Sequence, residues 1–387
     1  MQRTAVNGMI MSQLRVPAVY MRGGTSRAIV FRAVDLPAAR EGWAPIFLAA
    51  LGSPDPGSRQ LDGLGGGITS LSKVAVVGPS TRADADVDYT FAQVAVKEPL
   101  VQYKANCGNI SAAIGPFAVD EGMVQTSGNE AVVRIHNTNT GKIIVARFPT
   151  VDGKAAVDGD FVLQGVAGTG APIQLSFLDP GGAVTDKLLP TGKVRERVSV
   201  PGLGSIDMSL VDAANPVAFV SARDLGLYAN ETPEQLSMPE LLTKYEEIRV
   251  AAAVRMGIAD ENEARTNMRN LPFVALVAAP ISARSVGSAN AKPQEAHITV
   301  RMISSGQPHR ATPLTAAMCL AVAMRCPGTI PHQCARASEG DILIAHPSGV
   351  IPVAASVKDG VAESAIVYRT ARRLMEGAVL VPRSRLK

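Results

Sequence analysis

"TSRAIVFRAVDLP", residues 25–37, aligns without gaps with "ANPVAFVSARDLG", residues 214–226. Each stretch places a short polar turn before a strand that ends in Asp-Leu. A second pair agrees, because "CGNISAA" (107–113) and "ATPLTAA" (311–317) each set a polar turn before a small-residue helix. The alternative is chance similarity between short stretches. The chain thus contains twice the order of a turn and a strand followed by a turn and a helix. Because sequence repeats reflect repeated structural units, this order predicts two pseudo-symmetric halves.

Segments typical of strands outnumber segments typical of helices along the chain. Helices are expected at 40–51, 107–119, 239–256 and 312–325. This pattern predicts an α+β fold with helices packed on curved sheets, and not an alternating doubly wound sheet. The Gly/Pro/Asp-rich stretch near 180–190 is the expected junction. We therefore expect an N-terminal half at 1–185, which contains Lys73 and Cys107, and a C-terminal half at 186–387 whose last strand is allowed to return to the first.

The composition is that of a soluble globular protein, and 387 residues suffice for two domains. No segment is apolar and long enough to cross a bilayer, and the N-terminus lacks the pattern of a secretory signal, so a cytoplasmic protein is expected. The 38 basic and 34 acidic residues are scattered. Nucleic acid is therefore not an expected partner, whereas a small anionic substrate suits the mild positive excess. A homodimer is considered because such folds often associate in pairs.

The four cysteines, Cys107, Cys319, Cys326 and Cys334, contain no C-x-x-C pair, and zinc is not indicated. Disulfides are not expected in the cytosol, and the last three thiols are interpreted as packing residues. Cys107 differs because it opens an expected helix, where unpaired N–H groups and the helix dipole favour a thiolate. If the two halves face each other, their helix starts can share a cleft that binds carboxylates or phosphates.

A glycine-rich stretch, "LDGLGGGITSLSKVAVV" at 61–77, precedes a strand that begins with a lysine. It fails as a dinucleotide fingerprint because Ile68 stands where the third glycine is required and no strand precedes it. It fails as a phosphate-binding Walker loop because no glycine precedes Lys73. The remaining interpretation is a loop that brings backbone amides, Thr69 and Ser70 near a ligand and then delivers Lys73.

Lys73 is either a solvated charge at a strand edge or a base for a carbon acid. A lysine serves as such a base when burial or nearby cations bring its pKa toward neutrality, and Arg22 and Arg27 are candidate cations. Proton removal beside a carboxylate leaves charge on oxygen, so hydrogen-bond donors must be in place. The turn at Thr25 and Ser26 and the helix starts meet that requirement. Proton transfer at carbon is the expected reaction class.

Several motifs together closely resemble the PrpF family of methylaconitate isomerases, methylitaconate delta-isomerases and oxalomesaconate tautomerases. They are "MRGGTSR", "RQLDGLGGG", "SLSKVAVVGPSTRADADVDYTFAQV", "NCGNISAAIGPFA", "IHNTNTGK", "LPTG", "HPSG" and "RTARRLMEG". The stretches "DADVDYTFAQV", "HNTNTGK" and "DAANPVAFV" are most similar to the methylitaconate delta-isomerases. The resemblance implies a diaminopimelate epimerase-like fold, in which each half has a curved, mainly antiparallel sheet around a central helix.

The resemblance also implies an isomerase that needs neither cofactor nor metal. Its reaction is an allylic 1,3-proton shift or a cis-trans isomerisation of an unsaturated di- or tricarboxylate. Lys73 matches the family's principal base and Cys107 its partner, with a dienolate held by the amides of Gly108 and Asn109 and by the helix start at 312–315. The further expected carboxylate contacts are Thr25, Ser26, Thr69, Ser70, Asn215, His309 and Thr315. For His309, helix capping is the alternative.

Two features separate this chain from related patterns. Epimerases of the same scaffold use one cysteine from each half, whereas the repeat sets Ala311 opposite Cys107, which disfavours two-thiol epimerisation. Many relatives carry Lys-Gly where this chain has Arg27 and Ala28, which alters the expected carboxylate pocket. The alternatives to the isomerase are an amino- or hydroxy-acid epimerase or racemase and a non-catalytic carboxylate-binding protein.

Overall fold

A computed structural model describes residues 12–103, 107–280 and 296–386. The chain divides into two compact units, each described by itself: unit 1 is Met1–Leu175 with Arg369–Lys387, and unit 2 is Ser176–Tyr368. The division therefore falls earlier than 185, and the C-terminal segment belongs to unit 1. The Gly/Pro-rich stretch belongs to unit 2 because it is bonded to strand β13 (Gly204–Ala213): the Asp212 carboxylate accepts hydrogen bonds from the backbone of Val184 and Thr185.

Unit 1 is built on a mixed sheet. The chain forms β1 (Gln13–Gly23), β2 (Ser26–Arg32), α1 (Trp43–Leu51), β3 (Lys73–Pro79), β4 (Val87–Val94), β5 (Val101–Gln102), α2 (Gly108–Asp120), β6 (Glu130–Asn137), β7 (Lys142–Val151), β8 (Lys154–Ala155), β9 (Phe161–Val162), β10 (Thr169–Gly170), β11 (Ile173–Leu178), which runs past the boundary, and β21 (Ala371–Pro382). The strand order is β21-β1-β2-β3-β4-β6-β7. The pairs β2–β3 and β4–β6 are parallel, and the other neighbours in this order are antiparallel.

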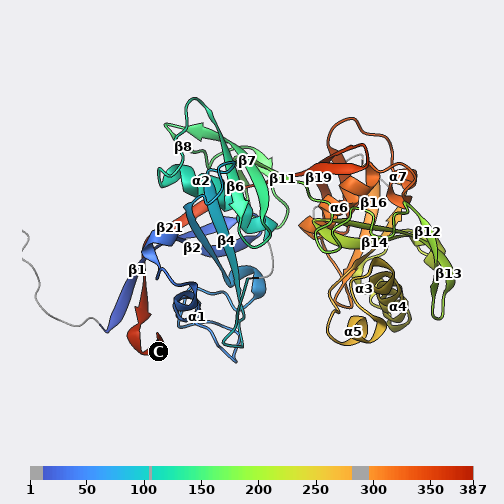
Figure 1. Cartoon of the computed structure of the whole chain (residues 1–387), viewed down its shortest axis with the longest axis horizontal. Coiled ribbons are helices and arrows are strands. Elements are labelled where there is room, and N and C mark those ends of the chain that lie inside the picture. Colours follow the sequence, from blue (N-terminus) through green and yellow to red (C-terminus); the bar gives the residue numbers. More distant parts are fainter. Residues whose placement is uncertain (1–11, 104–106, 281–295, 387) are drawn as a thin grey trace, which may run out of the picture. The chain divides into compact units, whose positions relative to one another are not determined.

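Unit 2 repeats this strand order. Its elements are β12 (Glu196–Val200), β13 (Gly204–Ala213), β14 (Asn215–Ser221), α3 (Pro233–Leu236), α4 (Pro239–Met256), α5 (Glu261–Thr266), β15 (Phe273–Ala278), β16 (Ile298–Ser304), β17 (Gln307–Pro308), α6 (Leu314–Met324), α7 (Ile330–Cys334), β18 (Ile342–His346), β19 (Gly349–Lys358) and β20 (Val361–Arg369). The sheet runs β12-β13-β14-β15-β16-β18-β19-β20, and again only two neighbouring pairs in this order, β14–β15 and β16–β18, are parallel. Figure 1 shows strands and helices packed together within each unit.

The internal repeat and the α+β fold class are confirmed. The repeated stretches form β2 and β14, which begin at the aligned residues Ser26 and Asn215, and each is followed by a 3₁₀ turn. The helix starts differ slightly. α2 begins at Gly108, whereas α6 begins at Leu314 and not at 312, because Pro313 is the N-cap and has a non-helical backbone.

The two faces of the unit 1 sheet carry different helices. Val74 and Val76 of β3 belong to an apolar cluster with Phe47 and Leu51 of α1. The opposite face carries α2, which is buried nearly all round. Small residues allow this close approach: a Cβ on Gly115 would lie 2.8 Å from the Phe148 ring of β7. The small-residue run in the sequence therefore marks a central helix, and in Figure 1 strands separate α1 from α2.

Candidate functional site

Lys73 is the first residue of β3 and is nearly buried, with 7% of its surface exposed. Its Nζ donates a hydrogen bond of 2.6 Å to Oε1 of Gln93, the residue opposite it on β4. The amine also lies 5.0 Å from the centre of the Phe91 ring. Gln93 Nε2 donates to the carbonyl oxygens of Ser72 and Thr69, which fixes the Gln93 oxygen toward the lysine. The amine is therefore held by a neutral oxygen against an aromatic face.

Residue alternation places Lys73 on the α2 face of the sheet. Val74 faces the α1 cluster, so Lys73 points to the other side. The same alternation corrects the expectation for the neighbouring arginines. Ala28 on β2 pairs with Lys73 and faces the same side of the sheet. Arg27 is the preceding residue, so it faces the other side, where its guanidinium lies over the Tyr20 ring. Arg22 donates to Gly24 and Thr370 instead.

Cys107 is the N-cap residue of α2 and is partly exposed. Its carbonyl accepts hydrogen bonds from the backbone N–H and the hydroxyl of Ser111. Tyr89 of β4 lies beside both residues. Burial raises the pKa of Tyr89 well above its usual value, and the nearby Cys107 adds to the shift. Because Tyr89, Phe91 and Gln93 share one strand face, Cys107 lies over the face that Lys73 occupies.

The turn between β1 and β2 is packed against the first turn of α2. A Cβ on Gly24, which has a φ of +53°, would lie 2.2 Å from Oδ1 of Asn109. A Cβ on Gly23 would lie 2.6 Å from the Asn109 carbonyl oxygen. Asn109 Nδ2 donates to Thr25 Oγ1 at 3.2 Å. The turn thus brings exposed Thr25, and buried Ser26 beside it, to the amides of Gly108 and Asn109.

The glycine-rich loop is arranged around a buried glutamine that the sequence analysis missed. Gln60 Oε1 accepts hydrogen bonds from the Gly67 N–H and the Ser72 hydroxyl. A Cβ on Gly65 would lie 2.2 Å from the Gln60 side chain. A Cβ on Gly67, which has a φ of +73°, would lie 2.1 Å from the Ser58 carbonyl oxygen, so local packing explains both glycines. Beyond them, exposed Thr69 and half-buried Ser70 form a 3₁₀ turn, and the Thr69 carbonyl accepts from Gln93.

The candidates of unit 2 form two separate contacts. Asn215 Nδ2 donates to Thr315 Oγ1 at 2.7 Å, so the hairpin turn is tied to the helix start as in unit 1. His309 Nε2 and Ser304 Oγ lie 2.6 Å apart, and burial lowers the pKa of His309. The N-cap of α6 is Pro313, so His309 is not its cap.

The repeat identifies which residues of unit 2 stand where Lys73 and Cys107 stand in unit 1. Ala28 on β2 pairs with Lys73, and its equivalent Val217 on β14 pairs with Phe273. Ala311 aligns with Cys107. At these equivalent positions, unit 1 carries an amine and a thiol, whereas unit 2 carries a phenylalanine and an alanine.

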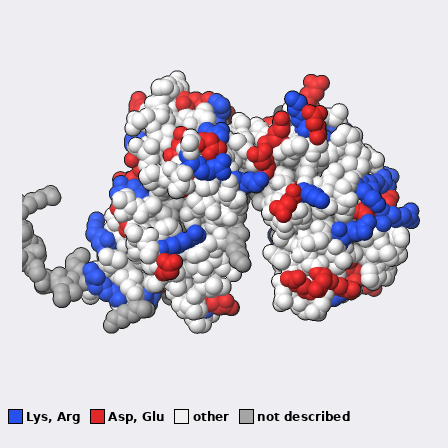
Figure 2. Space-filling view, viewed as in Figure 1, with Lys and Arg blue, Asp and Glu red and all other residues white. Residues whose placement is uncertain are grey.

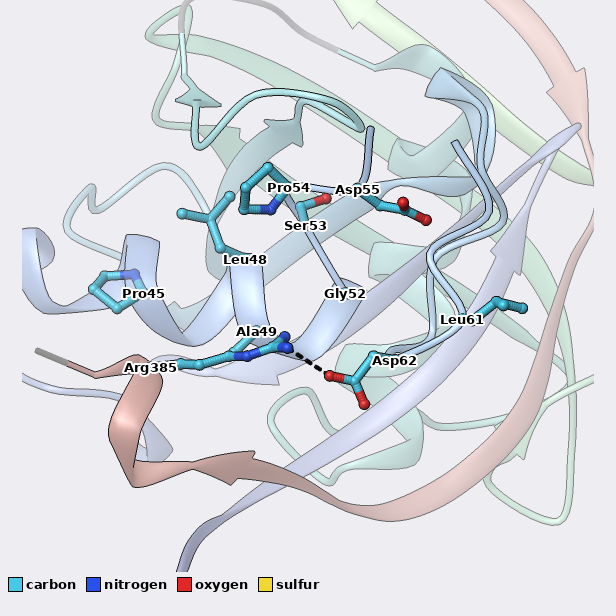
Figure 3. A pocket seen from close by; sticks show the side chains of 10 residues that line it. All are labelled: Pro45, Leu48, Ala49, Gly52, Ser53, Pro54, Asp55, Leu61, Asp62 and Arg385. Carbon is cyan, nitrogen blue, oxygen red and sulfur yellow. Dashed lines mark hydrogen bonds and ion pairs between the residues drawn. The ribbon is translucent and has the colours of Figure 1, made fainter. Parts of the chain in front are cut away.

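A cavity of about 640 Å³ lies elsewhere in unit 1. It is lined by α1 and the following loop, and an ion pair of 2.6 Å between Arg385 and Asp62 crosses it (Figure 3). None of the sequence-predicted site residues lines it. Within the described ranges, no three His, Cys, Asp or Glu side chains gather as metal ligands. Helices long and apolar enough to span a membrane are also absent from those ranges.

A model of the PrpF protein family matches residues 13–382, which is nearly the whole chain. The chain belongs to this family. Among PrpF relatives, the 3-methylitaconate isomerase of Eubacterium barkeri is 44% identical over 97% of this chain and 99% of its own. The 2-methyl-aconitate isomerase of Shewanella oneidensis is 35% identical, again over 97% of this chain and 99% of its own. The resemblance expected from the sequence is thereby confirmed.

Solved structures agree with the family assignment. The crystal structure of a methylitaconate-delta-isomerase matches with a TM-score of 0.92 and 44% identity, over 97% of this PrpF chain and 98% of its own. A hydroxyproline epimerase from Agrobacterium vitis matches with a TM-score of 0.51 at 13% identity, over 95% of this chain and 93% of its own. The second likeness shows the fold alone, and it supports the expected epimerase-like scaffold.

Proposed function

We propose that this chain is an isomerase that moves a carbon-bound proton along an unsaturated di- or tricarboxylate, with Lys73 as the base. The observation that carries the proposal is the nearly buried Lys73 amine, held by the neutral Gln93 oxygen on the sheet face that also carries the Cys107 helix start. Among the described residues, the hydrogen-bond partner of the Lys73 amine is this uncharged oxygen and not a carboxylate. Three relatives named as isomerases or tautomerases support the reaction class.

The proposed mechanism uses the chain's own residues. Lys73 Nζ removes a proton from the carbon next to the double bond, and negative charge spreads onto a substrate carboxylate. The backbone N–H groups of Gly108 and Asn109 at the start of α2 stabilise this charge, because they have no partners within the helix. Lys73 or Cys107 then returns a proton to the far carbon of the three-carbon unit, which moves the double bond without net change in atoms.

The preferred substrate within this class is methylitaconate. The relative with 44% identity carries that activity in its name, and three motifs of this chain resemble the same subgroup. Arg27 and Ala28 adjoin the proposed carboxylate-binding turn, so relative rates on methylitaconate, methylaconitate and oxalomesaconate test this choice. Thr25, Ser26, Thr69 and Ser70 are proposed contacts in unit 1, and Asn215, His309 and Thr315 are proposed contacts in unit 2.

Proton NMR in deuterated water tests the proposed reaction. Each of the three acids is mixed with the enzyme, and the vinyl and methyl signals are followed. Migration of the double bond with deuterium incorporation is expected for at least one acid. If neither migration nor exchange occurs with any of them, the proposal is wrong, and binding without exchange would instead indicate a carboxylate-binding protein.

Two variants test the residue roles. Lys73→Ala is expected to lower kcat by about 10²–10⁴-fold, the usual contribution of a positioned base, with the fold retained by circular dichroism. Cys107→Ser is expected to lose as much or less. A Lys73→Ala enzyme with normal turnover would remove the base assignment. An epimerase is disfavoured because Phe273 and Ala311 stand at the positions equivalent to Lys73 and Cys107.

We further propose a cytoplasmic location and a homodimer. The four cysteines are free thiols, which supports a reducing compartment. Figure 2 shows basic and acidic side chains mixed on the visible face of both units, so this face offers no continuous basic stripe for nucleic acid. Light scattering on the purified protein tests the dimer, and fractionation of cells tests the location.

A further inference from the structure

Arg369 ends β20 and opens the C-terminal segment of unit 1, and its surface is only 6% exposed. Its Nε donates a hydrogen bond of 3.1 Å to Oδ1 of Asn109. The next residue, Thr370, accepts hydrogen bonds from the Gly24 N–H and from Arg22. The segment is therefore fastened both to the β1–β2 turn and to the first turn of α2.

The Arg369 guanidinium determines how the Asn109 amide is turned. An arginine side chain carries donors and no acceptor, so the atom that faces Arg369 must be the amide oxygen. The Asn109 NH₂ group then faces Thr25 Oγ1, as the 3.2 Å hydrogen bond shows. Because the Thr25 oxygen accepts that bond, its own hydroxyl proton is directed elsewhere, and Thr25 is exposed. Asn109 and Thr25 therefore both have N–H or O–H groups to offer an anion.

Without Arg369, the amide has no reason to keep this orientation. Its oxygen could then take the place of the NH₂ group that faces Thr25, where it would repel a carboxylate. The glycines limit any other adjustment, because Gly24 lies so close to the Asn109 side chain that even a Cβ would clash with it. Burial of a guanidinium is costly unless it is paired, so a buried arginine at this place needs such a partner. Arg369 also interacts electrostatically with Cys107.

We propose that Arg369 is a positioning residue that fixes the Asn109 amide, so that Asn109 and Thr25 present hydrogen-bond donors to a carboxylate of the substrate. This inference rests on the proposed isomerase function and adds a specificity residue to it. Arg369 acts through Asn109, so its loss should weaken substrate binding more than it slows the chemical step.

The steady-state kinetics of methylitaconate isomerisation test this inference. Arg369→Gln is expected to raise KM by about tenfold, the loss of one charge-assisted contact, with kcat changed less than threefold. Asn109→Asp should raise KM further, because a carboxylate replaces the donor. Arg372→Gln is the matched control, since Arg372 is an exposed arginine three residues away, and its kinetics should equal the wild type.

A coupled pair of variants separates positioning from general damage to the fold. In an Asn109→Ala background, Arg369→Gln should cause no additional rise in KM, because the amide that it orients is gone. If KM rises by the same factor in both backgrounds, or if Arg369→Gln lowers kcat while KM stays normal, the inference is wrong.

Thr25 gives a test that does not depend on the buried arginine. Thr25→Ser keeps the hydroxyl and should keep the wild-type KM, whereas Thr25→Val should raise it. Equal KM values for the two variants would contradict the inference, even if Arg369→Gln fails to fold. A wild-type enzyme that turns over none of the three acids would refute the proposed function instead, and the two failures are therefore distinguishable.

Discussion

Gln93 holds the Lys73 amine with an oxygen that carries no charge, and this matters for a base. A carboxylate at the same place would favour the ammonium form of the lysine, which cannot accept a proton. Gln93 is itself oriented by its bonds to the Ser72 and Thr69 carbonyls. The strand pair therefore supplies an uncharged partner that positions the amine of the proposed base.

Gln93→Glu tests this arrangement. A carboxylate at this position would form an ion pair with the proposed base, so kcat/KM is expected to fall at least about tenfold. The measurement is the steady-state kcat/KM of the variant. Gln102→Glu is the matched control, since Gln102 pairs with Gln93 on β5 but is exposed; an unchanged kcat/KM for Gln93→Glu would contradict the role.

Local sequence patterns single out some of the proposed site residues and not others, for a physical reason. Lys73 and Cys107 stand at a strand start and a helix start, which local patterns reveal. Gln93 and Arg369 act through tertiary contacts, and Arg369 lies 260 positions from its partner Asn109. Arg27 was expected near Lys73, and strand alternation directs it to the other face. Pairing register, which decides such contacts, cannot be obtained from composition or spacing.

At the scale of elements, α4 fastens α5 and the loop behind it through one buried arginine. Arg249 is 3% exposed and donates to the carbonyls of Ala264, Met268 and Leu271. It also forms an ion pair with Glu246 one turn earlier. The bond to Ala264 replaces a helical partner that the end of α5 lacks, and the bonds to Met268 and Leu271 hold the loop behind it. Glu246 of α4 is thus one partner of a structural ion pair.

Arg249→Met should lower the free energy of unfolding of unit 2 by about 3 kcal/mol, because three carbonyls and a carboxylate lose their partner. Urea denaturation measures this change. Arg269→Met is the control, since Arg269 is exposed in the adjacent loop and should shift stability by less than about 0.5 kcal/mol. Equal stabilities for the two variants would show that Arg249 does not fasten α5.

A second link between α4 and α5 predicts how stability depends on pH. Both guanidinium branches of Arg265 bond to Glu247 at 2.8 Å, and these hydrogen bonds lower the pKa of Glu247. Folding lowers the pKa of this carboxyl below its value of about 4.3 in the unfolded chain. The ionised carboxylate therefore stabilises the folded protein above that pH, and this stabilisation is lost as the pH falls through the pKa of the folded state. Arg265→Met should therefore flatten the loss of stability below about pH 4.5.

Unfolding free energies between pH 3 and 7 check this prediction. At pH 7 the cost of Arg265→Met should stay below about 1 kcal/mol, because the guanidinium is partly exposed and screened. Glu247→Gln removes the same titration and should give the same flattened curve. Retention of the wild-type slope in both variants would exclude this pair as the source of the acid dependence.

The long helices were predictable, whereas short ones were overlooked. α1, α2, α4 and α6 all fall within or close to the expected ranges. α3 and α5 have only four and six residues, too few for a periodic pattern. Their starts nevertheless carry a local signal, because Thr232 with Gln235 forms a capping box and Asp260 caps α5. A search for caps would have found both.

At the scale of the whole molecule, the repeat predicted the topology because each half must bury the same small-residue helix against the same strand order. The junction was harder to place. The Gly/Pro-rich stretch has the composition of a linker, yet Asp212 holds it to β13 through bonds to Val184 and Thr185. Composition reports flexibility of the free chain, whereas long-range hydrogen bonds decide to which unit a segment belongs.

The asymmetry between the halves predicts the fate of the transferred proton. Phe273 and Ala311 stand where a second amine and thiol would be needed, so both proton transfers are expected from unit 1, on one face of the substrate. If Lys73 removes and returns the proton, a deuterium taken from the substrate becomes one of the three hydrogens of the Lys73 ammonium. Substrate deuterated at the reacting carbon, converted in ordinary water, should then carry up to roughly a third of its deuterium to the far carbon.

Mass spectrometry and NMR of the product at low conversion measure this transfer. Cys107→Ser should keep the transferred fraction, because the thiol is not on the path of the label in a single-base reaction. A product without transferred deuterium, formed on opposite faces at the two carbons, would require a second acid from elsewhere in the chain. That result would contradict the view that the repeat has kept its chemistry in one half and lost it from the other.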